Sequence, residues 1–306
     1  MKTKKTKKQK SRHLSRIITF LLCAAWFAGI VLLLYPTVSN YWNSLHSSRA
    51  ISSYAEAISA INEEEYAAMW ADALAYNAEL RPGTAAYTPG ETQSRAYSGL
   101  LNVDGSGIMG YIEIPKISVS LPIYHGTGEA VLQVGVGHLD WTSLPTGGEG
   151  THTVLSGHRG LPSAKLFTHL DQMEVGDTFQ LRILDEVLTY QVDQILIVLP
   201  EETSDLVIQK GKDYCTLITC TPYGINTHRL LVRGQRVETT EEVQAVRVTA
   251  EAVQVETTIV APILAIPVLL LVLFGMAVYD TVKKQRKRRE NAILHSLSSP
   301  TEVNRQ

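Results

Sequence analysis

The chain has 306 residues, 45% of them hydrophobic, and its 28 Lys and Arg residues nearly balance 30 Asp and Glu residues. The balance hides a segregation, because residues 1–16 carry eight basic residues, residues 283–289 carry six, and residues 36–282 carry 28 acids against 13 basic residues. The excess of acidic residues in residues 36–282 argues against nucleic acid as a partner, because phosphate binding requires a basic surface.

Residues 17–35 form an uncharged apolar run close to the roughly 20 residues that a membrane-spanning helix requires. The run is longer than the apolar core of a usual signal peptide, and no small-x-small cleavage site follows it. This pattern favours an uncleaved anchor over a signal peptide. The basic cluster in residues 1–16 then places the N-terminus in the cytoplasm by the positive-inside rule.

Residues 36–106 predict an extracellular helical appendage. Within residues 41–80, apolar side chains recur every three or four positions in an Ala- and Glu-rich background, which indicates one amphipathic helix. Arg81-Pro82-Gly83 ends that helix. Residues 84–106, with Pro89-Gly90 and several Ser and Thr, indicate a loop that is a candidate lid.

Residues 107–240 predict a domain that is mainly β. Short runs that alternate apolar and polar residues are separated by turn residues, and no run of helices intervenes. Seven or more such strands indicate a closed or nearly closed β-barrel. The candidate strands are residues 109–115, 118–124, 152–158, 178–184, 188–200, 214–220 and 229–237.

The chain has three cysteines, of which Cys23 lies in the first apolar run. Cys215 and Cys220 fall on one predicted strand, where their Cα atoms would be about 16 Å apart and their side chains on opposite faces. A disulfide needs Cα atoms within about 7 Å, so we expect these two not to pair. Taken alone, Cys220 could be an ordinary buried thiol, but one of the two could also be kept free for reactivity.

Three short motifs could together carry cysteine chemistry. Cys220 ends the β-branched strand TLITC, His158 lies between glycines in SGHRG, and Arg229 opens the strand after Cys220. A hairpin would bring Arg229 beside Cys220. Nearby cations lower the pKa of a catalytic thiol, and a guanidinium can donate hydrogen bonds to an acyl-transfer oxyanion.

A second apolar stretch, residues 259–279, follows a linker at residues 241–258. A buried core helix would be the alternative, but six basic residues follow at once, which favours a membrane helix with a cytoplasmic tail at residues 280–306. Two spans with both termini in the cytoplasm place residues 36–258 outside the cell. The expected location is therefore the cell membrane, with two passes through the lipid bilayer.

TLITC at residues 216–220, followed after eight residues by Arg229 and preceded by SGHRG, resembles the catalytic pattern of the sortase family. The similarity covers roughly residues 109–236 and extends to IEIPKISVSLPIYHGT and CTPYGINTHRLLVRG, which are similar to the class C, pilin-polymerising branch. The two-span topology with an N-terminal helical appendage is similar to that branch as well.

This resemblance implies a sortase-like β-barrel and an extracellular cysteine transpeptidase. It implies that Cys220 is the nucleophile that attacks the Thr–Gly bond of an LPxTG-like sorting signal. His158 would be the proton donor and acceptor, and Arg229 would hold the substrate and stabilise the oxyanion. The partners would be proteins with sorting signals, most of all pilin subunits as donor and as lysine acceptor; housekeeping sortases use a cell-wall precursor instead.

One feature departs from the class C pattern, and other functions stay open. Class C sortases often carry an Asp-Pro-aromatic lid motif in the region that matches residues 84–106, and this sequence has none.

Two other functions stay open besides that of a sortase. A membrane-tethered cysteine protease would use the same nucleophile, whereas a non-catalytic scaffold would bury Cys220. No ligand spacing typical of zinc is present, so no metal or cofactor is expected. Asp140 could orient His158 or cap a turn, and we expect His228 to face away from Arg229.

Overall fold

The computed structural model describes residues 2–80 and 97–240, together with isolated positions between 267 and 291. The chain divides into two units, Met1–Leu34 with Glu256–Gln306, and Tyr35–Val255. The predicted linker at residues 241–258 lies outside the described residues, as does most of the predicted second span at residues 259–279.

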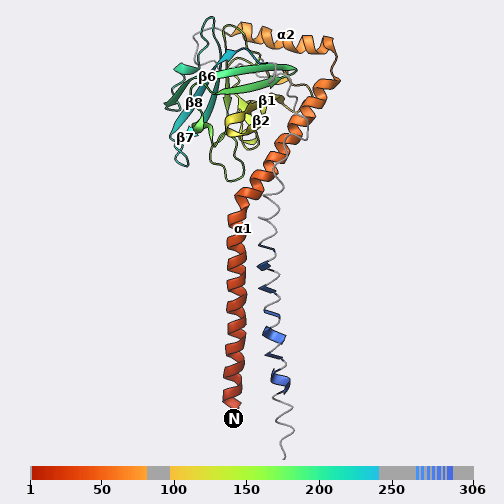
Figure 1. The fold of residues 1–306 in the computed structure, drawn as a ribbon, viewed down its shortest axis with the longest axis vertical. Helices are drawn as coiled ribbons and strands as arrows, with labels where there is room; N and C mark the ends of the chain where they lie inside the picture. The colour runs from red at the N-terminus through yellow and green to blue at the C-terminus, as the bar shows by residue number, and fades with distance from the viewer. Residues whose placement is uncertain are drawn as a thin grey trace, which may run out of the picture. The chain divides into compact units, whose positions relative to one another are not determined.

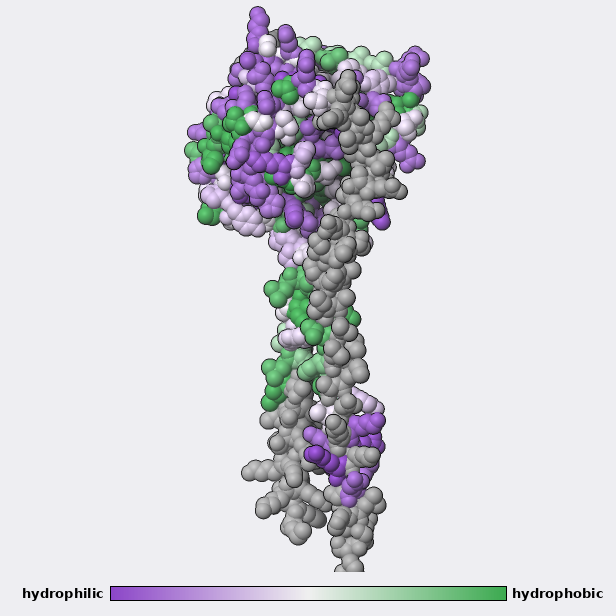
Figure 2. Space-filling view, in the orientation of Figure 1, coloured by the Kyte–Doolittle hydropathy of each residue, from purple (hydrophilic) through white to green (hydrophobic). Residues whose placement is uncertain are grey.

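The N-terminal helix α1 (Lys2–Ala60) is the one described helix that is long and apolar enough to cross a membrane. Its segment Phe20–Ala60 contains an 18-residue window of mean hydropathy 2.1, none of which is buried. Figure 2 shows the apolar belt on this helix, and Phe20 and Leu33 are 72% and 80% exposed. A helix that exposes apolar side chains all round suits lipid rather than water, as a membrane anchor or a signal sequence would.

The prediction of one helix over residues 41–80 is wrong, because the helix ends at Ala60 and a second helix, α2 (Glu63–Glu79), begins three residues later. Asn62 caps α2: its side chain accepts a hydrogen bond from the backbone N of Glu65 at 2.8 Å. The Glu65 carboxylate accepts one from the backbone N of Asn62 at 3.2 Å. This capping box starts a new helix where apolar periodicity alone predicts continuation.

Both helices are attached to the barrel by buried polar contacts. The Tyr54 hydroxyl on α1 is fully buried; it donates to the Met109 carbonyl at 2.7 Å and accepts from the Leu184 N–H at 2.8 Å. The Asn77 amide on α2 donates to the Leu144 carbonyl at 3.1 Å and accepts from the Leu144 N–H at 2.7 Å. Both side chains are therefore fully committed to the barrel, and the appendage is an integral part of its unit (Figure 1).

Eight strands close into a barrel in the order β1-β2-β3-β4-β7-β8-β6-β5. All seven predicted strands are confirmed, and the eighth, β3, was missed because it is only three residues long. The strands are β1 (Ile108–Ile114), β2 (Val119–His125), β3 (Val136–His138), β4 (Thr151–Ser156), β5 (Thr178–Ile183), β6 (Glu186–Val198), β7 (Asp213–Thr221) and β8 (His228–Val237). Between them lie the short helices η1 (Pro115–Ile117), α4 (Glu129–Leu132), η2 (Leu170–Gln172) and η3 (Ser204–Leu206).

Alternate side chains of β7 face two different apolar clusters. Cys215 and Leu217 belong to the large cluster in the barrel interior, with Phe179 and Tyr190. Ile218 belongs to a smaller cluster on the outside, which contains the buried residues Val154, Leu206 and Leu231. The outer face of β4, β7 and β8 is therefore apolar as well, and the candidate site lies on this face.

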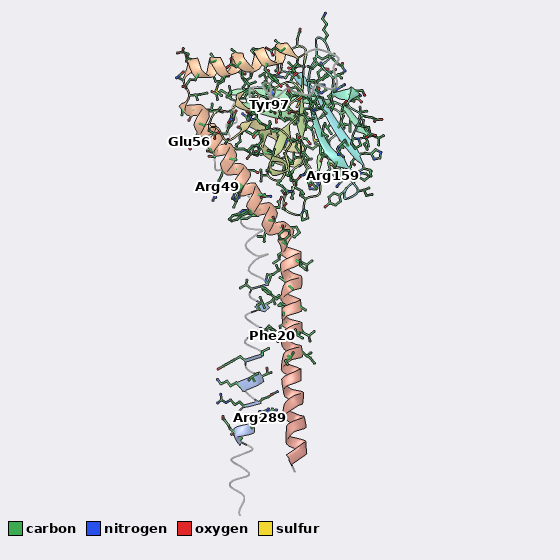
Figure 3. All side chains as sticks on the ribbon, turned by 180° about the vertical axis from the view of Figure 1, so that it is seen from behind. Phe20, Arg49, Glu56, Tyr97, Arg159 and Arg289 are labelled. Carbon is green, nitrogen blue, oxygen red and sulfur yellow. The ribbon has the colours of Figure 1, made fainter. Side chains whose placement is uncertain are left out.

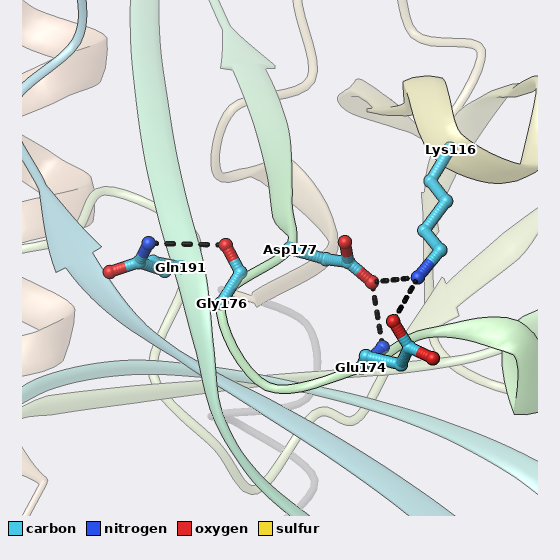
Figure 4. Close-up of polar contacts among 5 residues, drawn as sticks. All are labelled: Lys116, Glu174, Gly176, Asp177 and Gln191. Atoms are coloured by element: carbon cyan, nitrogen blue, oxygen red, sulfur yellow. Dashed lines mark hydrogen bonds and ion pairs between the residues drawn. The ribbon is translucent and has the colours of Figure 1, made fainter.

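Surface ion pairs fix several loops. Figure 4 shows Lys116 of η1 bound to Glu174 at 3.0 Å and to Asp177 at 2.8 Å. The hydrogen bond from Lys116 lowers the pKa of the Asp177 carboxyl, which also accepts from the backbone N of Glu174. These contacts hold the turn before β5 against η1. They are exposed, so we assign them a local structural role.

Candidate active site

Cys220 and Arg229 lie directly opposite each other on neighbouring strands. Cys220 is the penultimate residue of β7, Arg229 is the second residue of β8, and the antiparallel register pairs them. Side chains of directly opposed residues lie on one face of a sheet, with Cβ atoms about 5 Å apart. The hairpin predicted from the sequence is therefore confirmed, and it places both side chains on the same face of the sheet.

The two cysteines of β7 occupy opposite faces, as strand parity predicts. Cys215 is fully buried in the barrel interior, and this burial raises the pKa of its thiol well above the usual range. Cys220 is only half-buried and shares the outer face with Ile218. Both are free thiols. Of the two, Cys220 is the one that a solute can reach.

His158 approaches Cys220 from the other neighbouring strand. β4 runs parallel to β7 and pairs Ser156 with Ile218. Beyond the end of β4, the Gly157 N–H donates to the Ile218 carbonyl at 3.0 Å, and the Thr219 hydroxyl donates to the Gly157 carbonyl at 2.8 Å. If this register is extended two residues beyond Ser156, His158 comes level with Cys220, on backbones separated by the usual strand spacing of about 4.8 Å.

The two glycines of SGHRG are required by the local geometry. A Cβ on Gly157 would lie 2.6 Å from the ring of Phe167, so only glycine lets this ring pack against the His158 loop. Gly160 has a φ of +77°, in the left-handed region that glycine enters without strain. The glycines that flank His158 thus allow a sharp and tightly packed loop.

Arg159 connects the His158 loop to the end of the Cys220 strand, a role that the sequence did not reveal. Its guanidinium donates to the Thr221 hydroxyl at 3.3 Å and forms an ion pair with Asp171. It also lies 6.0 Å from the centre of the Tyr223 ring. The Arg159 side chain, labelled in Figure 3, is only 9% exposed. The Arg159 side chain therefore links the His158 loop to the end of β7.

Arg229 has no carboxylate partner among the described residues. Its guanidinium donates only to the carbonyls of Asn226 and His228, at 3.3 and 3.1 Å. Arg233 on the same strand differs, because it pairs with Asp193 at 2.9 Å. Most of the donors of Arg229 therefore remain available to a bound molecule.

An open groove of about 190 Å³ runs over the outer face of β4, β7 and β8 and contains Arg229. One wall is the connection between β6 and β7, and the floor is formed by the outer apolar cluster. The apolar lining residues are Leu139, Trp141, Val198, Leu199, Pro200, Leu206, Ile218 and Leu231, and the others are Thr127, Ser156, Glu202, Thr203 and Arg229. A peptide with apolar side chains fits such a surface, and Arg229 can donate hydrogen bonds to the backbone carbonyls of the peptide.

Comparison with known proteins agrees with this geometry. Residues 112–237 match the model of a protein family that is described as the sortase domain. Sortase C1 of Streptococcus agalactiae is 50% identical, with a TM-score of 0.61, over 63% of this chain and 100% of that chain. The chain belongs to the sortase family. It is a cysteine transpeptidase, and the structures that it resembles at this level of identity are class C sortases.

Two further class C structures bear on the substrates. Sortase C of Streptococcus pneumoniae, described with reference to pilin substrate specificity, is 47% identical (TM-score 0.57) over 63% of this chain and 98% of that chain. Sortase C of Clostridium perfringens, solved with the C-terminal cell wall sorting motif, is 46% identical (TM-score 0.55) over 62% of this chain and 99% of that chain.

A buried histidine holds the groove wall of this sortase in place. The His152 ring donates from Nδ1 to the Val207 carbonyl at 3.0 Å and accepts at Nε2 from the Thr216 hydroxyl at 2.7 Å. Val207 follows η3 in the connection between β6 and β7. Burial lowers the pKa of His152 to about 4, so the ring is neutral at physiological pH and this pattern is stable there.

The carboxylate beside His158 is that of Glu129, and not that of Asp140, for which the sequence left open either this role or the capping of a turn. The Glu129 Oε2 atom lies 3.7 Å from His158 Nε2. In the described part of the chain, the hydrogen bond found for Asp140 is through its backbone carbonyl, which accepts from the Tyr76 hydroxyl at 2.9 Å. Glu129 was missed because it lies 29 residues from His158 in sequence.

His228 pairs with Thr221 and is adjacent to Arg229 on β8, so the His228 side chain faces the opposite side of the sheet from Arg229, as predicted.

The candidate lid region is described only from Tyr97 onward. Tyr97 is 5% exposed; its hydroxyl donates to His138 Nδ1 at 2.8 Å and accepts from the Gly126 N–H at 3.1 Å. Tyr97 is therefore part of the folded core. Tyr87 and Pro89, which belong to the candidate lid, lie outside the described residues.

Proposed function

We propose that this sortase cleaves an LPxTG-like sorting signal through a thioacyl intermediate on Cys220 and transfers the acyl group to an amine, a pilin lysine. The observation that carries this proposal is the direct pairing of Cys220 with Arg229 on the outer face of the hairpin, at a groove suited to a peptide. The apolar floor suits the Leu and Pro of such a signal, because burying apolar side chains is favourable.

The chemistry divides among three side chains. The sulfur of Cys220 attacks the Thr carbonyl carbon, and the Arg229 guanidinium donates hydrogen bonds to the oxyanion that forms. His158 donates a proton to the leaving glycine amine as the C–N bond breaks. The thioester then persists until an amine attacks the same carbon, expels the Cys220 sulfur, and gives its proton to His158.

Pilin subunits are the proposed donor and acceptor. The support is the likeness to class C sortases at 46–50% identity, one of which was solved with a sorting motif and another described with reference to pilin substrates. A cell-wall precursor as acceptor would instead mark a housekeeping sortase. Mass spectrometry of products formed from an LPxTG-type peptide with a lysine-containing pilin peptide or a short oligoglycine separates the two. Exclusive transfer to oligoglycine, or hydrolysis alone, would contradict the pilin assignment.

We further infer that the enzyme crosses the membrane twice, with the barrel outside and both termini in the cytoplasm. The support is the exposed apolar face of α1 and the basic clusters beside both apolar runs. Protease added to intact, wall-stripped cells should digest residues 36–258 and spare a C-terminal tag. Digestion of the tag would rule out this topology.

A further inference from the structure

Glu129 and His158 lie next to each other but are not directly hydrogen-bonded. The Glu129 Oε2 and His158 Nε2 atoms are 3.7 Å apart, which exceeds the usual range of about 2.7–3.2 Å for a direct hydrogen bond. The Glu129 side chain is 73% exposed and that of His158 is 26% exposed. A carboxylate and an imidazole therefore lie nearly in contact, and solvent can reach both groups.

The orientation of Glu129 is set by Gln133, the residue that caps the C-terminal end of α4. The Gln133 amide donates to Glu129 Oε1 at 2.6 Å, one helical turn away. This bond occupies one carboxylate oxygen and leaves Oε2 directed at His158. Thr127, two residues before Glu129, and Ser156, two residues before His158, both line the groove. The pair of Glu129 and His158 thus follows two segments that line the groove.

The spacing lets one nitrogen atom contact both groups from the side that faces solvent. An atom can lie about 2.9 Å from both Oε2 and Nε2, because their separation is less than twice that distance. A primary ammonium has three N–H donors, so it can bind a carboxylate and a neutral imidazole nitrogen together. We propose that Glu129 is the binding site for the protonated amine of the acceptor, which it holds against His158.

This inference rests on the proposed function and adds the recognition of its second substrate. A lysine side chain is protonated at neutral pH, since its pKa is about 10.4, and it must approach a site that already contains the cationic Arg229. A carboxylate beside His158 offsets that repulsion. It also favours a cationic acceptor over a neutral nucleophile such as water.

The proton balance is complete within the site. The bound ammonium gives one proton to His158 Nε2, and the resulting amine attacks the thioester carbon. The C–N bond forms, the C–S bond breaks, and the second proton of the nitrogen passes to the departing Cys220 sulfur. The imidazolium, which stays beside the Glu129 carboxylate, then releases its proton to water.

The test compares a cationic and an uncharged acceptor. The full-length enzyme in detergent micelles is given an LPxTG-type peptide with either Nα-acetyl-lysine amide or hydroxylamine, which is uncharged at neutral pH. Glu129→Gln keeps the shape and the bond from Gln133 but removes the charge. We expect it to lower the ratio of kcat/KM for the lysine acceptor to that for hydroxylamine about tenfold, through KM, as for one lost charge-assisted hydrogen bond.

Two variants serve as controls. Glu149→Gln removes the same charge from an exposed residue next to the start of β4, at the far end of the β4–β7 pair from Cys220, and should leave the ratio at the wild-type value. Glu129→Asp keeps the charge and should restore part of the ratio. A melting temperature within the error of the wild-type value shows that each variant is folded.

Two results would overturn the assignment of Glu129. An unchanged ratio in Glu129→Gln means that the carboxylate does not bind the acceptor. An equal loss with both acceptors means that Glu129 acts only through His158. If the wild-type enzyme transfers the peptide to neither acceptor although Cys220 is readily alkylated, the proposed function itself is wrong and the acceptor site is rejected with it.

Discussion

At the scale of single residues, strand parity separates two thiols that are only five positions apart. Cys215 packs in the barrel interior, whereas Cys220 lies half-exposed opposite Arg229. This distinction was predictable from sequence, because alternation along a strand needs no tertiary information. The contacts of Glu129 and Arg159 were not predictable, since both depend on which loops meet in three dimensions.

The first prediction uses this pair of thiols as nucleophile and control. Cys220→Ala should abolish release of product from a sorting-signal peptide while the unfolding transition stays intact. Cys215→Ala should keep most activity and lose about 1 kcal/mol of stability, because it removes one buried sulfur from the interior cluster. Measurable turnover by Cys220→Ala would exclude Cys220 as the nucleophile.

A second prediction concerns the geometry of Arg229. Arg229→Lys keeps the charge but replaces a planar fork of donors by a single ammonium. If the guanidinium stabilises the oxyanion, kcat should fall on the order of 10²–10³-fold with a smaller effect on the KM for the peptide. Arg233→Lys is the matched control, because Arg233 lies on the same strand in an ion pair with Asp193. Activity of Arg229→Lys close to the wild-type level would refute the oxyanion role.

At the scale of elements, the strands were easier to predict than the helices. Alternating apolar and polar residues marked seven strands, but β3 is too short to show a pattern. The break between α1 and α2 was missed although Asn62 and Glu65 carry the signature of a capping box, because apolar periodicity continues across it. Local capping chemistry decided the outcome there.

The third prediction concerns the segment before Tyr97. Its composition, with Gly83, Gly90 and Ser94 and without an Asp-Pro-aromatic motif, predicts weaker gating than a standard class C lid. Since Tyr97 is buried, a deletion must end before it. Removing residues 84–94 should change the alkylation rate of Cys220 less than about twofold, because a segment that gates weakly protects the thiol little. An acceleration of several-fold would show that this segment covers the thiol.

At the scale of the whole molecule, two buried histidines link stability to pH. Burial lowers the pKa of His138 and of His152 from 6.5 to about 4. As the pH falls below 6.5, these two histidines become protonated in the unfolded chain but stay neutral in the folded chain. The stability that is present above pH 6.5 is therefore lost progressively towards pH 4. At pH 5 the loss should be roughly 2 kcal/mol for each histidine.

Denaturant unfolding of the ectodomain at pH 7.5 and pH 5 checks this fourth prediction. Wild-type protein should lose free energy of unfolding between the two conditions. His138→Gln and His152→Gln, although less stable at pH 7.5, should each lose less. Equal losses in all three proteins would assign the acid sensitivity to other groups.

The parallel pairing of β4 with β7 also has a consequence for the order of folding. Cys220 and Arg229 come together through a short hairpin, but His158 reaches them only when two segments about 60 residues apart align, as in the bond from Thr219 to Gly157. Contacts of such sequence separation form late, because closing a long loop costs entropy before any contact compensates it. During refolding, therefore, the secondary structure should return first, and the capacity to transfer an acyl group should lag behind it.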